Sequence, residues 1–238
     1  MPSPRTIAYG TLPDQVGDLL LPDGDGPWPV VVLVHGGFWR DRYRRDTLTP
    51  LAEAITATGS ATWNIEYRRV GPPGGGWPET ADDVLAAFDA LPSLPAPLDL
   101  QQVSVVGHSA GGHLALWLAG QRSLAGVVSL AGVADLVAAE RDHLGDDATT
   151  EFLRGGAAAD VPAADPVRLL PTGVPSLLVH GDEDVHVPID QSERYEAAAR
   201  AAGDDCGLLR VPGADHFVVV DPSSDAWRQA WQAWPGRS

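Results

Sequence analysis

Short runs of apolar, mostly β-branched residues alternate along this chain with segments whose apolar residues recur at helical spacing. The runs typical of buried strands are residues 30–34, 61–67, 103–106, 127–130, 177–179 and 208–211. Helical patterns cover residues 48–55, 78–91, 110–119 and 191–202, and a closing helix carries Trp227, Trp231 and Trp234 on one face. This alternation predicts an α/β fold, a mostly parallel sheet of about eight strands with helices on both faces.

Two of the expected helices carry finer signals. In the helix over 78–91, Thr80 and Asp83 stand at capping-box spacing, which predicts that they cap its first turn. The helix over 110–119 is apolar nearly all round, so we expect it to be buried on every side.

No internal repeat, low-complexity tail or clear linker divides the chain. Its 238 residues suit one large α/β domain, so we expect residues 1–238 to form a single domain. The segment 135–171 lies between two expected strands and has no strand pattern of its own. It is too long for a plain connection, and we expect helical pieces or a cap-like flap there.

The charge balance excludes some classes of partner. The net charge is −16, and all sixteen basic residues are arginine. A nucleic-acid partner requires a basic face, which this composition does not offer. The N-terminus lacks the apolar stretch of a secretory signal, and no apolar run reaches the ~18 residues of a membrane helix. We expect a cytoplasmic monomer or homodimer with neither nucleic-acid nor membrane partners, and with the lone Cys206 as a structural residue.

The strongest chemical signal is Gly-His-Ser-Ala-Gly at residues 107–111. It follows an expected strand and opens the buried helix, the setting in which G-x-S-x-G presents a nucleophilic serine on a tight turn. A side chain at Gly107 or Gly111 would collide with the neighbouring strand and helix. Ser109 is therefore the candidate nucleophile, and the helix N-terminus beneath it favours the negative charge that develops during attack.

An oxyanion hole is expected from two places. One N–H donor comes from the residue after the nucleophile, which is Ala110. Another comes from the glycine-rich loop His-Gly-Gly-Phe-Trp at residues 35–39, where either Gly37 or Phe38 is the donor. His35 itself precedes the serine in the chain, so we expect it to brace this loop rather than act as the base.

The base and the acid should follow the serine in the order acid, then histidine. His216 lies past the last expected strand and is the candidate base. The loop after the penultimate strand offers Asp182, Glu183 and Asp184 as acids. Asp184, just ahead of a Val-Pro pair, fits best, with Asp182 as the alternative. Asp215 lies too close to His216 in sequence to orient it and is expected to cap the loop.

His180, Asp182, Asp184 and His186 alternate along one loop, but not on one face of a strand. This spacing does not favour a metal site, so we expect no metal and no cofactor. His186 is expected at a pocket rim or on the surface. Phe38, Trp39, Arg40 and Tyr43 either line an acyl or aryl pocket or pack the loop, and the candidate pocket residues are Trp39, His108 and Phe217.

Taken together, the motifs His-Gly-Gly-Phe-Trp, Gly-His-Ser-Ala-Gly-Gly, His-Gly-Asp-Glu-Asp-Val-His-Val-Pro and Gly-Ala-Asp-His-Phe resemble α/β-hydrolases of the arylformamidase-like and small carboxylesterase groups. The resemblance covers about Leu19 to Trp234 and implies the α/β-hydrolase fold. It also implies an oxyanion hole at Gly37, Phe38 and Ala110 and an acid at Asp184.

The expected function is that of a serine hydrolase. Ser109 would attack a small ester or an activated amide such as an N-formyl aryl amide, and an acyl-enzyme would then be hydrolysed. A short-peptide or acyl-aminoacyl hydrolase is an alternative, although a dipeptidyl-peptidase-like enzyme would usually carry a propeller domain for which this chain has no room. A non-catalytic binding protein with this fold is a further alternative.

Overall fold

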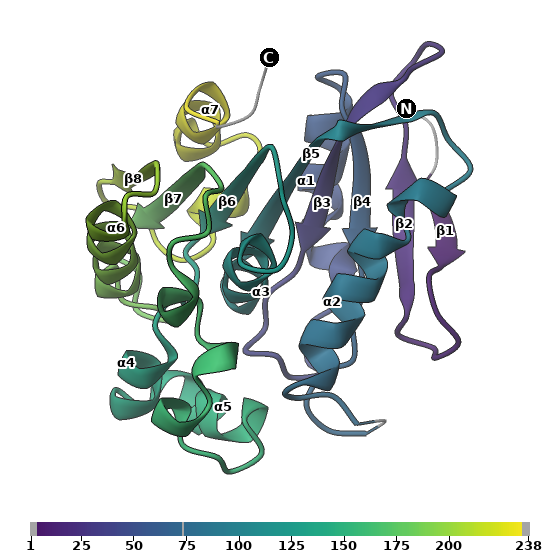
Figure 1. The fold of residues 1–238 in the computed structure, drawn as a ribbon. Helices are drawn as coiled ribbons and strands as arrows, with labels where there is room; N and C mark the ends of the chain where they lie inside the picture. The colour runs from purple at the N-terminus through teal and green to yellow at the C-terminus, as the bar shows by residue number, and fades with distance from the viewer. Residues whose placement is uncertain (1–3, 73, 235–238) are drawn as a thin grey trace.

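The protein is described by a computed structural model that covers residues 4–72 and 74–234 (Figure 1). Eight strands form one sheet in the order β1-β2-β4-β3-β5-β6-β7-β8. Their bounds are β1 Arg5–Ala8, β2 Val16–Leu20, β3 Trp28–Val34, β4 Ala61–Ile65, β5 Leu98–His108, β6 Gly126–Leu130, β7 Ser176–Gly181 and β8 Cys206–Val211. The six strands from β4 to β8 in this order pair in parallel, which confirms the predicted sheet.

The first two strands are an antiparallel addition that the sequence pattern did not identify. β1 pairs only with β2, and β2 continues antiparallel onto β4. β1 has four residues and lies largely exposed at the sheet edge, so it carries no apolar run. Such short, polar edge strands are common because an exposed apolar edge would promote aggregation.

Helices cover both faces of the sheet (Figure 1). One face carries α2 (Glu79–Asp89), α3 (Ala110–Ala119) and α6 (Asp190–Ala202), and the other carries α1 (Thr49–Thr56) and α7 (Asp225–Gln232). Each face has its own apolar core. Leu114, Leu116 and Tyr195 are buried in the first, and Leu51, Ile55 and Trp227 in the second.

The prediction for α3 is confirmed, because all ten of its residues are buried. The prediction of a capping box in α2 is wrong. Pro78 occupies the N-cap position and makes no side-chain cap, while the Thr80 hydroxyl donates to the Arg68 carbonyl. Asp83 is buried and pairs with the Arg68 guanidinium at 2.7 Å. Both side chains thus hold the connection after β4 against α2 instead of capping the helix.

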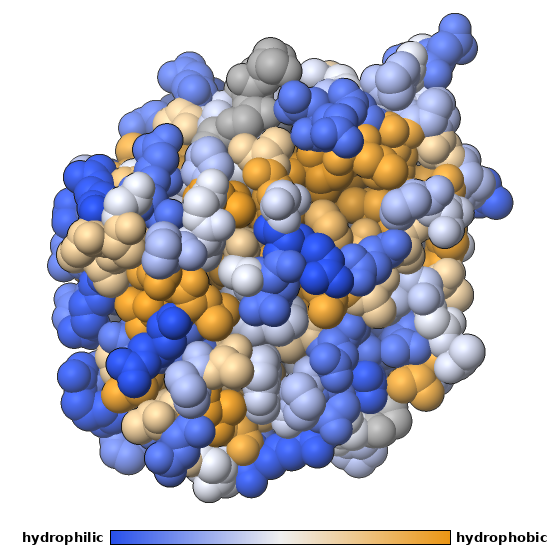
Figure 2. All heavy atoms as spheres, viewed as in Figure 1, coloured by the Kyte–Doolittle hydropathy of each residue, from blue (hydrophilic) through white to orange (hydrophobic). Residues whose placement is uncertain are grey.

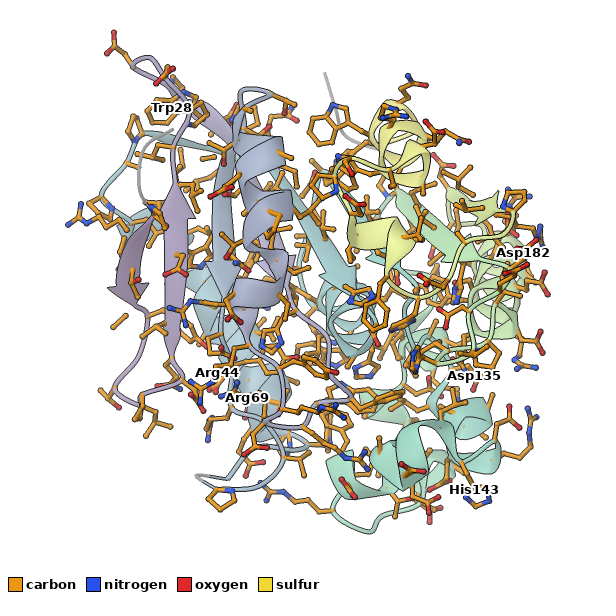
Figure 3. The ribbon with its side chains drawn as sticks, turned by 180° about the vertical axis from the view of Figure 1, so that it is seen from behind. Trp28, Arg44, Arg69, Asp135, His143 and Asp182 are labelled. Atoms are coloured by element: carbon orange, nitrogen blue, oxygen red, sulfur yellow. The ribbon has the colours of Figure 1, made fainter. Side chains whose placement is uncertain are left out.

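The segment between β6 and β7 is built from short helices at the carboxyl end of the sheet. They are α4 (Leu136–Arg141), α5 (Leu144–Phe152) and the 3₁₀ helices η3 (Ala158–Asp160), η4 (Pro162–Ala164) and η5 (Pro166–Leu169). Figure 3 marks α4 and the start of α5 by Asp135 and His143. Further 3₁₀ helices are η1 (Arg45–Leu48), η2 (Leu91–Ser93) and η6 (Val218–Val220).

Polar and apolar residues are interspersed on the face shown in Figure 2. Among the described residues, no helix combines the length and the apolar character needed to cross a bilayer.

Candidate active site

Ser109 occupies the turn between β5, which ends at His108, and α3, which begins at Ala110. Its backbone has φ 55° and ψ −120°, a strained conformation for a residue with a side chain. The Ser109 N–H donates to the Leu130 carbonyl at 2.9 Å, which ties the turn to the end of β6. This is the geometry expected of a nucleophile presented at the carboxyl edge of the sheet.

Two glycines make this turn possible. A Cβ atom at Gly107 would overlap the Gly111 carbonyl on the first turn of α3. A Cβ at Gly111 would overlap the carbonyl oxygens of Val34 and His35 at the end of β3. The steric reason inferred from the sequence for these glycines therefore holds, because helix and strand backbones approach here too closely for any side chain.

The structure brings His216 to Asp184. His216 follows β8, Asp184 follows β7, and His216 Nδ1 lies 2.6 Å from Asp184 Oδ2. The other oxygen of Asp184 accepts hydrogen bonds from the N–H groups of His186 (2.8 Å) and Val187 (2.9 Å). The alternative acid, Asp182, is exposed and its Oδ1 accepts instead from the Gly213 N–H at 2.6 Å.

Asp184 is held as a carboxylate. Burial raises its pKa, but the hydrogen bonds from His180 and His216 and the charge of His216 outweigh burial, so the pKa lies well below the usual 3.8. A carboxylate acceptor places the proton of His216 on Nδ1, which leaves Nε2 as the acceptor of the imidazole.

His180 is a supporting residue whose role the sequence did not reveal. It is fully buried, and its Nε2 lies 2.8 Å from the Val187 carbonyl and 3.3 Å from Asp184 Oδ2. Its Nδ1 lies 2.7 Å from the Ser192 hydroxyl on α6. The sequence signal that could have indicated this role is the position of His180 near the end of a strand, two residues before the acidic loop that contains Asp184.

The expected oxyanion donors lie on either side of the nucleophile turn. In the described part of the chain, the N–H groups of Gly37, Phe38 and Ala110 donate no hydrogen bond. Gly37 and Phe38 have φ values of 112° and 52°, so the loop turns in the left-handed region. A Cβ at Gly36 would lie 2.9 Å from Ser109 Cβ, which shows how closely this loop approaches the nucleophile.

His35 braces the loop, as the sequence suggested. Its Nδ1 lies 2.8 Å from the Gly36 carbonyl and its Nε2 lies 2.7 Å from Glu66 Oε1. Glu66 is buried next to Arg69 at 3.2 Å. Burial raises the pKa of Glu66, but the hydrogen bond and charge of His35 and the charge of Arg69 bring it below 4.5. Glu66 was missed because it ends an apolar strand pattern and gives no local signal.

A cavity of about 270 Å³ opens above Ser109 and His216. Its other lining residues are Gly36, Gly37, Phe38, Arg40, Arg42, Tyr43, Thr47, Leu48, His108, His186, Phe217 and Val220. Of the candidate pocket residues, His108 lines the wall and Phe217 lies half-exposed at the mouth. Burial lowers the pKa of His108 to about 3, and its Nε2 donates to the His216 carbonyl at 3.0 Å.

The placement of Trp39 in the pocket wall is wrong. Trp39 is fully buried behind the loop, where its ring stacks on Phe152 with centroids 4.5 Å apart. Its Nε1 donates to His113 Nδ1 at 3.3 Å. The side chain therefore packs the oxyanion loop against α5 instead of facing a substrate.

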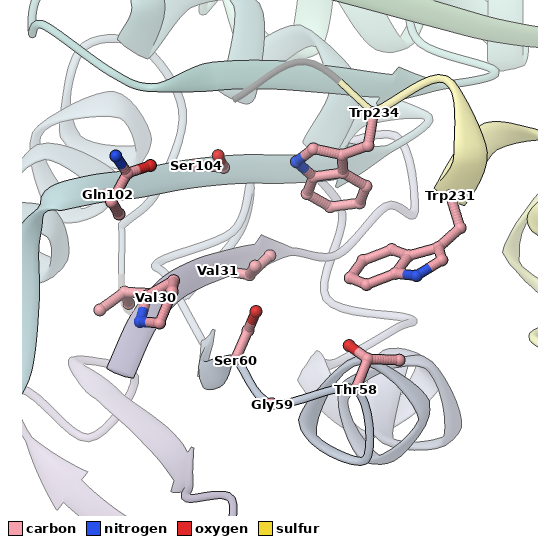
Figure 4. Close-up of a pocket in the computed structure, with 10 residues that line it drawn as sticks. Val30, Val31, Thr58, Gly59, Ser60, Gln102, Ser104, Trp231 and Trp234 are labelled. Carbon is pink, nitrogen blue, oxygen red and sulfur yellow. The ribbon is translucent and has the colours of Figure 1, made fainter. Parts of the chain in front are cut away.

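The described residues form no metal centre, and a second cavity among them lacks catalytic groups. Within residues 4–72 and 74–234, no three His, Cys, Asp or Glu side chains converge as metal ligands would. A second cavity of about 250 Å³ lies at the opposite end of β3, beside Trp231 and Trp234 (Figure 4). Its described lining residues include no acid, base or thiol, so none of them would activate the hydroxyls of Thr58, Ser60 or Ser104 as a nucleophile.

Comparison with known proteins supports the fold and the family. The sequence model of the prolyl oligopeptidase family (Peptidase_S9) matches residues 75–237. An uncharacterized peptidase, YuxL of Bacillus subtilis, is 26% identical over 90% of this chain and 35% of its own length. Esterase LipQ of Mycobacterium tuberculosis is 29% identical over 79% of this chain and 50% of its own length. The chain thus spans half or less of these two relatives.

Solved structures share the fold at low sequence identity. The thermophilic esterase Est2 of Thermogutta terrifontis has a TM-score of 0.80 and 20% identity, covering 98% of this chain and 90% of its own. A bifunctional GH43-CE protein of Bacteroides eggerthii has a TM-score of 0.83 and 22% identity, covering 95% of this chain and 34% of its own. These matches show the α/β-hydrolase fold, and none of them singles out the arylformamidase-like branch that the motifs resemble. Since the family model covers more than half of the sequence, the chain belongs to the prolyl oligopeptidase family of α/β-hydrolases.

Proposed function

We propose that this protein is a serine hydrolase that cleaves a small ester or an activated amide through an acyl-enzyme. The observation that carries the proposal is the Asp184–His216 pair, 2.6 Å apart, whose histidine shares a small cavity with Ser109. Nucleophile, acid and base follow one another in the chain in the order of this fold. The N–H groups of Gly37, Phe38 and Ala110 have no hydrogen-bond acceptor among the described residues.

The reaction proceeds in two acyl transfers. His216 Nε2 takes the Ser109 proton as the hydroxyl attacks the carbonyl carbon, and Asp184 stabilises the imidazolium. The N–H of Ala110, with that of Gly37 or Phe38, stabilises the tetrahedral oxyanion. His216 then protonates the leaving group, activates water, and returns the proton to Ser109 when the acyl group leaves as an acid.

Small acyl or aryl esters are the preferred substrate class. A cavity of about 270 Å³ holds a small molecule but not an extended peptide, and LipQ and Est2 are each named esterases. The motif resemblance adds N-formyl aryl amides as a second chemical class that the same acyl transfer would cleave.

A short-peptide hydrolase is the second candidate, because the family model is that of prolyl oligopeptidase. YuxL is named a peptidase and a relative from Aspergillus terreus is named a probable dipeptidyl-peptidase 5. The chain covers 35% and 32% of these two proteins, so their activities reach this chain only as proposals.

The test combines active-site labelling with a substrate panel. A fluorophosphonate probe should label the protein at Ser109, and Ser109→Ala should abolish both labelling and hydrolysis of 4-nitrophenyl acetate. Ser123→Ala is the matched control, because Ser123 is exposed and outside the cavity. Labelling that persists in Ser109→Ala would overturn the assignment. A higher kcat/KM on dipeptidyl 4-nitroanilides than on the ester would favour a peptidase. A higher kcat/KM on N-formyl aryl amides than on the ester would favour a formamidase.

A further inference from the structure

We propose that the substrate of this site carries a carboxylate and that the Arg42 guanidinium binds it. The inference rests on the proposed function, since it names the substrate class of the same cavity. It starts from an unusual charge distribution in an acidic protein.

The described residues that line the cavity include no carboxylate. The chain has 32 acidic residues against 16 basic ones, yet the titratable residues that line this cavity are Arg40, Arg42, Tyr43 and three histidines. The buried Asp184 lies behind His216 and already accepts hydrogen bonds through both oxygens. The wall that a substrate touches is therefore neutral or cationic.

Only one of the two cavity arginines is available to a ligand. The guanidinium of Arg40 donates to Glu151 (2.7 Å) and to the carbonyls of Gly145 (2.7 Å) and Asp146 (2.8 Å). Arg42 forms no hydrogen bond or ion pair with the described residues. Its single interaction is with the ring of Tyr43, whose centroid lies 5.4 Å from the guanidinium carbon. Its N–H donors are thus free to bind an anion.

The Tyr43 ring links this cation to the oxyanion loop. A Cβ atom at Gly37 would lie 2.8 Å from the Tyr43 ring, so the ring packs directly on a candidate oxyanion donor. Arg69 donates to the Tyr43 carbonyl at 3.0 Å, and the Arg45 N–H donates to Glu66 at 3.2 Å. Figure 3 labels Arg44, on the loop after β3, near Arg69, which follows β4. The backbone on the C-terminal side of Arg42 is therefore tied in place, in the wall of the cavity that also contains Ser109.

The chemistry of a guanidinium selects the ligand. Its planar fork matches a carboxylate and binds it through two parallel hydrogen bonds. The rest of the wall is apolar, with Phe38, Leu48, Phe217 and Val220 available to a short hydrocarbon or aryl group. A half-ester of a dicarboxylic acid or an acyl ester of a hydroxyaryl carboxylate combines both features. An overall charge of −16 repels anions in general, so a preference for them requires this local cation.

Matched substrate pairs test the inference. One pair carries the charge on the acyl side, as mono-4-nitrophenyl adipate and its methyl ester. The other carries it on the leaving group, as 3-acetoxybenzoate and its methyl ester. We expect wild-type kcat/KM to favour the carboxylate in at least one pair, and Arg42→Gln to lower that ratio by about fivefold to tenfold. Arg42→Lys should retain part of the preference, and high salt should weaken it.

Arg44→Gln is the control, because it removes the same charge from the same loop outside the cavity. In Arg44→Gln, the ratio of kcat/KM for the carboxylate to kcat/KM for its methyl ester should equal that of the wild type. Equal ratios in wild type and Arg42→Gln for both pairs would overturn the inference, as would an equal loss in Arg44→Gln. A variant that misplaces Tyr43 would lower both members of a pair together and leave the ratio unchanged. Failure of fluorophosphonate labelling would instead overturn the proposed function, so the two failures are distinguishable.

Discussion

Asp165→Asn should raise the free energy of unfolding relative to the wild type by an amount that increases with pH. Asp165 is fully buried where the two ends of the 135–171 segment meet, and its Oδ1 accepts from the Leu136 N–H at 3.0 Å. Its Oδ2 has no hydrogen-bond partner among the described residues. Burial raises the pKa of Asp165 from 3.8 to about 6, since the charged form loses its hydration.

The magnitude follows from this shift. A carboxyl group whose folded pKa exceeds its unfolded value penalises the folded state when it ionises. Stability is therefore greatest below pH 3.8 and falls as the pH rises through 6. With these two pKa values the penalty is about 1.6 kcal/mol at pH 5 and about 3 kcal/mol at pH 8. Asparagine cannot ionise, so the stability difference between variant and wild type should grow by about 1.4 kcal/mol over this range.

Urea unfolding of both proteins at pH 5 and pH 8, followed by tryptophan fluorescence, measures this difference. Any fixed cost of the buried amide appears at both pH values and cancels. The exposed Asp182, changed to asparagine, is the control and should show no such growth. A difference between Asp165→Asn and wild type that is constant with pH would refute the reasoning.

Three further changes test the site. Asp184→Asn should lower kcat/KM for a 4-nitrophenyl ester by about 10³–10⁴-fold, since an amide favours the wrong tautomer of His216, whereas Asp182→Asn should lower it less than tenfold. Glu66→Gln should lower the free energy of unfolding by about 2 kcal/mol in urea, because the buried Arg69 loses one of its two carboxylate partners and keeps only Asp14, at 3.1 Å. Gly111→Ala should lower it by roughly 2–4 kcal/mol and abolish activity, because Cβ meets the β3 backbone. Gly207→Ala should stay near wild type in both assays, because its Cβ would make an ordinary van der Waals contact with Leu177 at 3.9 Å. If Asp182→Asn lowered kcat/KM as much as Asp184→Asn, the prediction for Asp184 would be contradicted. If Glu66→Gln or Gly111→Ala unfolded at the wild-type urea midpoint, the prediction for that residue would be contradicted.

The sequence predicted the parallel part of the fold well, because β4, β6 and β7 are buried along their whole length and β3 and β5 over the half that approaches the site, which gives short apolar runs. The Ser109 turn was found for a related reason. A local glycine pattern marks it, although only the contact that requires Gly107 is local, with the first turn of α3, while Gly111 is required by the backbone of Val34 and His35 at the end of β3.

Other features depend on contacts between distant segments, which a local pattern does not contain. The choice of Asp184 over Asp182 follows from the loop conformation, which turns one carboxylate inward and leaves the other exposed. Trp39 was misplaced because its side chain turns toward Phe152, which lies more than a hundred residues later. Thr80 and Asp83 were misread because Arg68, on the neighbouring connection, determines their partners.

The nucleophile, acid and base stand at the ends of β5, β7 and β8, three parallel strands of one sheet. The loop after β3, by contrast, carries Phe38 and Arg42, and Arg40 fastens it to the helices that follow β6. Proton transfer is thereby placed at the ends of the strands, and the proposed carboxylate recognition on a loop that also carries a candidate oxyanion donor. Selection can exchange the residues that recognise a substrate, or resize the helices behind them, while the proton-transfer groups keep their places.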